Sequence, residues 1–171
     1  MSAQMEANLA EVENEQQDIL NEGKGKTDIQ RFLTFVTDGL TFGVNSNQVV
    51  EIITNHKVRA IPMVPDYVTG VINLRGQVIP IIDMRLRLGK MFQEYTPQTC
   101  TIILEIDSNP IGITVDSVSQ VLDIDLLKAS PIPVENRQEL TNNMISIDDG
   151  TVVLILECQE LMGNIGDSMM M

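Results

Sequence analysis

Histidine, cysteine and aromatic residues are scarce in this 171-residue sequence, and each shortage excludes a class of function. His56 is the only histidine, tryptophan is absent, and six residues are Phe or Tyr. Cys100 and Cys158 lie apart in apolar runs, so the chain lacks the three or four spaced ligands of a zinc site. Two thiols also do not make a disulfide framework, and we expect both to be free and buried.

Long apolar runs are missing as well. No run approaches the ~20 residues that span a bilayer, so we expect no direct membrane insertion. The acidic N-terminus has no charged-then-apolar signal pattern. These two observations predict a soluble, cytoplasmic protein.

Basic residues are outnumbered, with 11 Lys and Arg against 24 Asp and Glu and a net charge of −13. Because neutralising phosphates requires a net basic surface, we expect no nucleic acid partner. Residues 57–90 are the exception, with six basic and two acidic residues. This positive segment has two interpretations, a surface for an acidic protein partner or charges that guard a solvated strand edge. Its basic residues are Lys57, Arg59, Arg75, Arg85, Arg87 and Lys90.

Catalytic motifs are not visible in the sequence. His56 lies in a polar connection without supporting acids. The segment Gly23–Thr27 lacks the full spacing of a phosphate-binding loop and follows no strand. No serine occupies a strand-to-helix nucleophile elbow. We therefore expect no enzyme activity, no metal and no cofactor.

Alternation of apolar and polar residues begins at Ile29 and favours β-strands. Short aliphatic and β-branched runs are separated by turn residues, which is typical of an all-β barrel or sandwich. The dipeptide at 38–39, Asp-Gly, and the same dipeptide at 149–150 each predict a tight hairpin. Asn45–Val49 predicts a short helical turn. Pro80 lies inside an apolar run, so we expect its strand at an edge or with a bulge.

The two halves of the chain share a weak repeat. Gln48–Ile52 (QVVEI) resembles Gln120–Ile124 (QVLDI), which suits two related β-units. Composition divides the chain into three parts: a disordered acidic tail over 1–28, a folded domain over 29–162, and a flexible C-terminus over 163–171.

The segment Pro62–Arg85 is the most informative part of the sequence. Two strand-like runs flank Asn73–Gly76, which reads Asn-Leu-Arg-Gly and predicts a tight turn that presents Arg75 at a fixed place. The planar fork of arginine suits carboxylates and backbone carbonyls. Glu51 stands in an otherwise apolar strand, where it is either solvated or paired, and Arg75 is a candidate partner.

These segments, together with Phe32–Phe35 and Gly112–Val118, resemble the CheW family of bacterial chemotaxis coupling proteins over nearly the whole folded domain. The resemblance implies an all-β fold of two intertwined five-stranded SH3-like β-barrels with short helical turns. It implies a non-catalytic adaptor that links the signalling tips of methyl-accepting chemoreceptors to the regulatory domain of the histidine kinase CheA. Such an adaptor is cytoplasmic and is recruited to membrane-associated receptor arrays.

The resemblance also implies a receptor-binding groove between the barrels, into which a helical receptor tip would fit. Glu51 and Arg75 would form an ion pair that fixes the shape of the groove, and Gly70 would allow a close backbone approach. The groove residues carried over are Val49, Glu51, Gly70, Arg75, Val78, Cys100 and Val121.

Two alternatives remain open at this point. One is the coupling domain of a CheV-like protein, a fragment of CheA or another signalling scaffold, although an end at Met171 leaves no room for a receiver or ATPase module. The other, less favoured, is an enzyme built on a small barrel.

Overall fold

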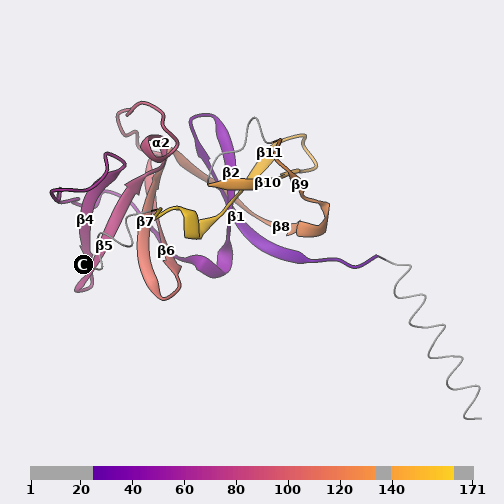
Figure 1. The fold of residues 1–171 in the computed structure, drawn as a ribbon, viewed down its shortest axis with the longest axis horizontal. Helices are drawn as coiled ribbons and strands as arrows, with labels where there is room; N and C mark the ends of the chain where they lie inside the picture. Colours follow the sequence, from indigo (N-terminus) through magenta and orange to yellow (C-terminus); the bar gives the residue numbers. More distant parts are fainter. Residues whose placement is uncertain (1–24, 134–139, 164–171) are drawn as a thin grey trace, which may run out of the picture.

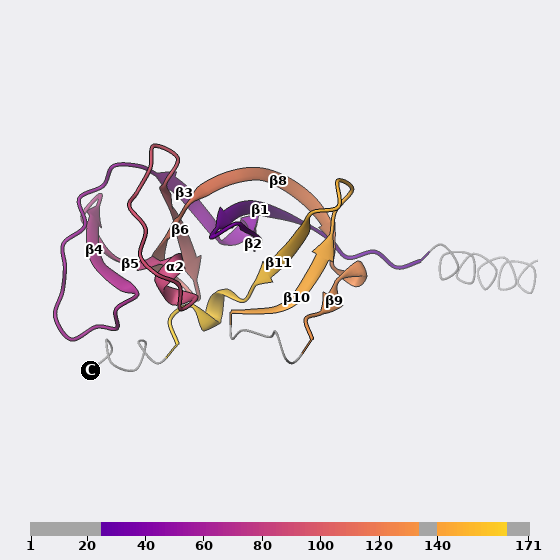
Figure 2. The same ribbon diagram turned by 90° about the horizontal axis from the view of Figure 1, so that it is seen from above.

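The computed structural model describes residues 25–133 and 140–163, and these residues form two strongly curved β-sheets. Figure 2 shows the strands of one sheet on the left and those of the other on the right. The predicted tail and C-terminus lie mostly outside the described residues, and their boundaries stay predictions. Among the described residues, no helix has the length and apolar character needed to cross a membrane.

The first sheet, barrel A, contains six strands (Figure 1). In sheet order they are β8 (Ser117–Asp125), β1 (Ile29–Thr37), β2 (Leu40–Asn45), β11 (Val152–Leu156), β10 (Thr141–Ser146) and the two-residue β9 (Ser130–Pro131). The second sheet, barrel B, contains five: β3 (Val49–Ile53), β6 (Cys100–Ile106), β7 (Asn109–Val115), β5 (Gln77–Asp83) and β4 (Val68–Leu74). Short helices complete the fold: η1 (Ser46–Gln48), α2 (Met84–Arg87), η2 (Leu126–Lys128) and η4 (Cys158–Glu160).

Both barrels have the same topology, and each takes strands from both halves of the chain. In barrel A, β8 pairs antiparallel with β1, and β2 pairs parallel with β11. In barrel B, β3 pairs antiparallel with β6, and β7 pairs parallel with β5 in the same way. The weak sequence repeat falls on β3 and β8, which cross from one barrel to the other. This exchange explains why the barrels are intertwined.

Each sheet curls around an interior cluster of its own residues. In barrel B the edge strands contribute Ile53 from β3 and Ile72 from β4 to one buried cluster, so the two edges face a shared interior. In barrel A, Ile124 from β8 and Ile145 from β10 share a cluster with Phe32. Because burying aliphatic side chains is the main favourable term in folding, these clusters give each barrel a core.

A third and larger core joins the barrels. Phe35 and Phe42 of barrel A stack with ring centroids 5.4 Å apart in this cluster. Barrel B contributes Ile102 and Ile113 among others, and Leu161 comes from the turn after β11. The all-β fold with two related units is therefore confirmed.

Some local predictions are confirmed and one is wrong. The Asp38–Gly39 turn has φ of 52° and 73°, as a type I′ hairpin requires. Asn45 caps η1 by accepting a hydrogen bond from the Asn47 backbone N–H. Pro80 was expected in an edge strand or one with a bulge, but β5 sits between β7 and β4, and the register shift of the β4–β5 ladder lies on β4, between Val68 and Gly70. Pairing with β7 begins only at Ile81, so the missing N–H of Pro80 removes no hydrogen bond from that ladder.

Barrel A has one strand more than predicted. The additional strand is β9, which pairs with β10 at Asn143 and Met144. Barrel B has a counterpart too small to be a strand, because Arg59 forms a single antiparallel bridge with Val71 of β4. Each barrel is therefore a five-stranded unit with a short sixth segment at one edge.

Candidate protein-docking site

An ion pair spans the two open edges of barrel B. Arg75 lies in the β4–β5 turn with φ of 53°, and Gly76 follows with φ of 84°. Its guanidinium donates two hydrogen bonds to the Glu51 carboxylate on β3, at 2.5 Å (Nη1 to Oε1) and 3.2 Å (Nη2 to Oε2). The hydrogen bond that Arg75 donates to Glu51, together with the negative charge of Glu51, raises the pKa of Arg75. The ion pair predicted between these residues is confirmed.

The turn that presents Arg75 is held by its own side chains. Asn73 accepts a hydrogen bond from the backbone N–H of Gly76 at 2.9 Å, which fixes the turn locally. The Arg75 side chain is 75% exposed, whereas that of Glu51 is 25% exposed. A partner that covers this pair would therefore meet arginine first, with the carboxylate behind it.

Exposed aliphatic residues lie close to the ion pair along the same strands. Val50 and Ile52 on β3 and Val78 on β5 are all exposed, although each belongs to a strand. Their neighbours Ile53 and Ile79 point into the barrel and are buried. We call the set Val50, Glu51, Ile52, Arg75 and Val78 the barrel B rim. Protein interfaces combine apolar residues with polar ones, and arginine is enriched in them.

A hollow lies beside the rim. It has a volume of about 420 Å³ and is lined by His56, Lys57, Arg59, Val71, Ile72, Asn73 and Val78. Among the described residues, the structure shows no ion pair for Lys57 or Arg59. The hollow therefore adds positive charge next to exposed Val78.

Gly70 allows two backbone segments that line this hollow to approach each other closely. Its φ is +150°, and a Cβ at this position would lie 2.1 Å from the carbonyl oxygen of Arg59. The Arg59 backbone exchanges two hydrogen bonds of 2.8 Å with Val71, the next residue of β4. No side chain fits between these backbones, so the close approach expected at Gly70 is present in the structure.

The remaining predicted residues do not share one exposed patch. Val49 is half-buried against the core between the barrels, and Cys100 lies within this core at 7% exposure. Burial raises the pKa of the Cys100 thiol. Val121 is exposed on β8 of barrel A, opposite Leu33. Glu51, Arg75, Val78 and Val121 are the predicted residues that lie at the surface, whereas Cys100 is largely buried.

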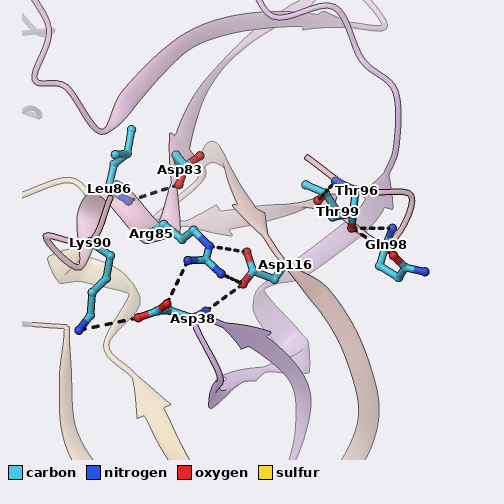
Figure 3. Close-up of polar contacts among 9 residues, drawn as sticks. All are labelled: Asp38, Asp83, Arg85, Leu86, Lys90, Thr96, Gln98, Thr99 and Asp116. Atoms are coloured by element: carbon cyan, nitrogen blue, oxygen red, sulfur yellow. Dashed lines mark hydrogen bonds and ion pairs between the residues drawn. The ribbon is translucent and has the colours of Figure 1, made fainter. Parts of the chain in front are cut away.

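Three of the six basic residues of the positive segment have partners in other parts of the fold. Arg85 binds Asp38 and Asp116, and Lys90 approaches Asp38 at 3.8 Å (Figure 3). Arg87 donates hydrogen bonds to the carbonyl oxygens of Leu161 and Glu160. Both interpretations made from the sequence fail for Arg85 and Arg87, because their partners lie within the fold and far away in sequence.

The residues described give no support for catalysis. No group of three or more His, Cys, Asp or Glu in this part of the chain could hold a metal ion. Asp83 is buried, but its carboxylate accepts hydrogen bonds from the Tyr95 hydroxyl at 2.9 Å and from the Leu86 N–H that begins α2. The Asp83 carboxylate therefore has a structural role, because its hydrogen bonds anchor the 88–99 connection and the start of α2.

Sequence reasoning missed two rim residues. Val50 and Ile52 are exposed, like Val78, and they lie on the same strand as Glu51. The signal was present, because two aliphatic residues at alternate positions share one face of a strand. With Ile53 assigned to the barrel interior, Val50 and Ile52 could have been assigned to the outside.

Comparison with known proteins identifies the family. The family model of the CheW-like domain matches residues 31–165. The chain is 36% identical to the chemotaxis protein CheW of Klebsiella aerogenes over 109 residues, covering 64% of this chain and 66% of that protein. It is 28% identical to CheW of Bacillus subtilis, covering 77% of this chain and 90% of that one.

A solved structure agrees with the sequence comparisons. The scaffolding protein TtCheW from Thermoanaerobacter tengcongensis superposes with a TM-score of 0.74 at 26% identity, covering 80% of this chain and 94% of that one. The proteins of this family are non-catalytic chemotaxis adaptors, so the enzyme alternative is excluded by membership and not by a missing motif. The chain belongs to the family of CheW-like domain proteins.

Proposed function

We propose that this chain couples the signalling tips of methyl-accepting chemoreceptors to the regulatory domain of the histidine kinase CheA. In this role it works in the cytoplasm and is recruited to membrane-associated receptor arrays. Family membership and the likeness to a scaffolding protein support the role of an adaptor. The specific partners are the part that experiment must test.

The receptor tip binds at the barrel B rim in this proposal. The observation that carries it is the Glu51–Arg75 pair, which lies at the surface and is close in sequence to exposed Val50, Ile52 and Val78. A receptor tip is a helical hairpin, and its apolar stripe would cover the aliphatic residues while a polar side chain meets Arg75. Val49 and Cys100 contribute indirectly by packing in the core between the barrels, and Val121 extends the surface onto barrel A.

A charge-swap cycle at the rim tests this proposal. Glu51→Arg and Arg75→Glu each place like charges opposite one another, and we expect each to weaken receptor-tip binding on the order of tenfold, as for a central interface residue. The double variant restores the pair in reverse and recovers part of the loss. Titration calorimetry with a purified receptor-tip hairpin gives the affinities.

The control is the Arg31–Asp123 pair on barrel A. Its two side chains are 64% and 58% exposed, and Asp123 occupies the repeat position equivalent to Glu51. Swapping these charges should leave receptor-tip binding unchanged. If the rim double variant binds no better than either single variant, or if the barrel A swap weakens binding as much, the rim is not the receptor site. Binding of the CheA regulatory domain, measured in parallel, tests the second partner separately.

A further inference from the structure

The short helix α2 connects the two barrels through its arginines. It follows β5 directly and so belongs to barrel B. Arg85 and Arg87 both leave this helix toward elements of barrel A. Its counterpart in barrel A is η4, which follows β11 in the same way and carries no basic residue in its last turn. The two equivalent turns are therefore joined by Arg87, a cation supplied by α2, while Arg85 reaches other elements of barrel A.

Arg85 binds two carboxylates that come from different parts of the chain. Its Nε and Nη2 donate to Asp116 at 3.0 and 2.6 Å, a bidentate arrangement, and its Nη1 donates to Asp38 at 3.0 Å (Figure 3). Asp38 lies in the β1–β2 turn of barrel A, and Asp116 lies where the chain passes from β7 of barrel B to β8 of barrel A. The Arg85 side chain is only 17% exposed, so water and salt screen these bonds little.

The two carboxylates are themselves tied to barrel A. The Asp116 backbone N–H donates to the Val36 carbonyl of β1 at 3.0 Å, and its carboxylate accepts from the Asp38 N–H at 2.9 Å. Burial disfavours the charge on Asp116, but hydrogen bonds from Arg85 and the Asp38 backbone, with the charge of Arg85, still hold its pKa below the usual value. Lys90, at 3.8 Å from Asp38, balances the second negative charge.

Arg87 makes a second connection beside the first. Its Nη2 donates to the Glu160 carbonyl at 2.7 Å and its Nε to the Leu161 carbonyl at 3.1 Å, both at the end of η4. The guanidinium also lies over the ring of Tyr67, 4.9 Å from its centre. Tyr67 is bound to barrel B, because its carbonyl accepts from the Asp83 N–H at 2.8 Å.

We propose that Arg85 and Arg87 are positioning residues that fix the angle between the two barrels. The core between the barrels is largely aliphatic, and apolar contact is not directional, so the core alone holds the barrels together without specifying their angle closely. Bidentate arginine bonds are directional and supply the missing constraint. Resting on the proposed function, this angle sets the distance between the barrel B rim and Val121 of barrel A, which a receptor tip would span.

The test measures the inter-barrel distance in the full chain without any partner. Spin labels are attached at two exposed positions, Ser119→Cys on β8 and Glu105→Cys on β6. Pulsed electron–electron double resonance then gives the distance between the two labels. Cys100 and Cys158 are buried, so they do not compete for the label in the folded protein. We expect one narrow distance distribution for the parent chain and at least a twofold broader one for the combined variant Arg85→Gln and Arg87→Gln.

A conservative variant and a control separate positioning from stability. Arg85→Lys keeps the charge but loses the bidentate bond, so we expect a distance distribution of width between those of the parent chain and the double glutamine variant. This variant also keeps the test usable if the glutamine variants fail to fold. Arg31→Gln removes an ion pair within barrel A and should leave the distribution unchanged. An unchanged distribution in folded Arg85→Lys and in the glutamine variants overturns the proposal. Because no receptor is present, this failure is distinct from a failure of the rim as a docking site.

Discussion

Barrel A and barrel B share one topology but carry different chemistry at equivalent places. In barrel B, Glu51 on β3 pairs across the open edge with Arg75 in the β4–β5 turn. In barrel A, the repeat position of Glu51 is Asp123 on β8, which pairs with Arg31 on the adjacent strand β1. The turn equivalent to that of Arg75 contains Asp149 and Gly150 instead. Among the residues described, an ion pair therefore joins the two edges of the sheet in barrel B and not in barrel A.

This difference separates what the fold requires from what binding requires. The ladder order and the interior clusters are common to both barrels, so they reflect the demands of curling a small sheet around aliphatic side chains. The edge-spanning arginine is not common to both and is not needed for that purpose. A feature present in one copy of a duplicated unit is the better candidate for a function of its own.

Substitution of Gly70 in barrel B is expected to cause the largest loss of stability. A Cβ there would lie 2.1 Å from the Arg59 carbonyl oxygen, with φ at +150°. We expect Gly70→Ala to cost about 3 kcal/mol or more of unfolding free energy, because backbone atoms on both sides must move. Urea denaturation followed by circular dichroism measures this loss.

Two control substitutions show whether the requirement for glycine is specific to position 70 of barrel B. Asn143 occupies the equivalent place on β10, at the same kind of register shift, and already bears a side chain. Asn143→Ala should cost less than about 1 kcal/mol. Gly76 has positive φ but open space around its Cβ position, so Gly76→Ala should cost about 1–2 kcal/mol. Equal losses at Gly70 and Gly76 would show that the Arg59 contact is unimportant.

A smaller effect is expected from acid at the junction between the barrels. The pKa of Asp116 is lowered in the folded protein, so its ion pair stabilises the fold above the unfolded pKa of about 3.9. This contribution is lost as the pH falls through the lower folded value. We expect the stability of the parent chain to fall between pH 5 and pH 2 more steeply than that of Asp116→Asn. Parallel slopes in urea titrations of the two proteins would contradict this account.

The smallest effect on stability is expected at the rim itself. Arg75 is 75% exposed and Arg31 is 64% exposed, and exposed ion pairs contribute little to folding. Arg75→Gln and Arg31→Gln should therefore leave the thermal midpoint within experimental error. A clear drop for Arg75→Gln, without one for Arg31→Gln, would mean that the pair closes barrel B rather than serving recognition.

Local signals in the sequence predicted much of the fold. The Asp38–Gly39 hairpin follows from the dihedral angles that only such dipeptides accept readily, and the repeat of QVVEI and QVLDI marked the two strands that exchange between barrels. The Glu51–Arg75 pair was predictable because Arg75 is presented by a tight turn and Glu51 is the one charge in its strand. Each of these features has a signal in a short stretch of sequence, even where, as for Glu51 and Arg75, the two residues lie 24 positions apart.

Features that depend on distant parts of the chain were not predictable. Arg85 and Arg87 look like surface charges in the sequence, since their partners lie 31 to 74 residues away. Cys100 was expected at the groove, but the start of β6 faces the core between the barrels. Neither the partner of a charge nor the buried face of a strand is set locally, because both depend on how two sheets pack.

The most direct test of the central claim is a backbone amide map of receptor-tip binding. Titrating the isotope-labelled full chain with a receptor-tip hairpin should shift amides of residues 49–53 and 74–79 first, together with those around Val121. The β10–β11 turn of barrel A, where Asp149 and Gly150 stand in place of the arginine turn, should not shift. Shifts confined to barrel A, or none at saturating receptor tip, would contradict the account.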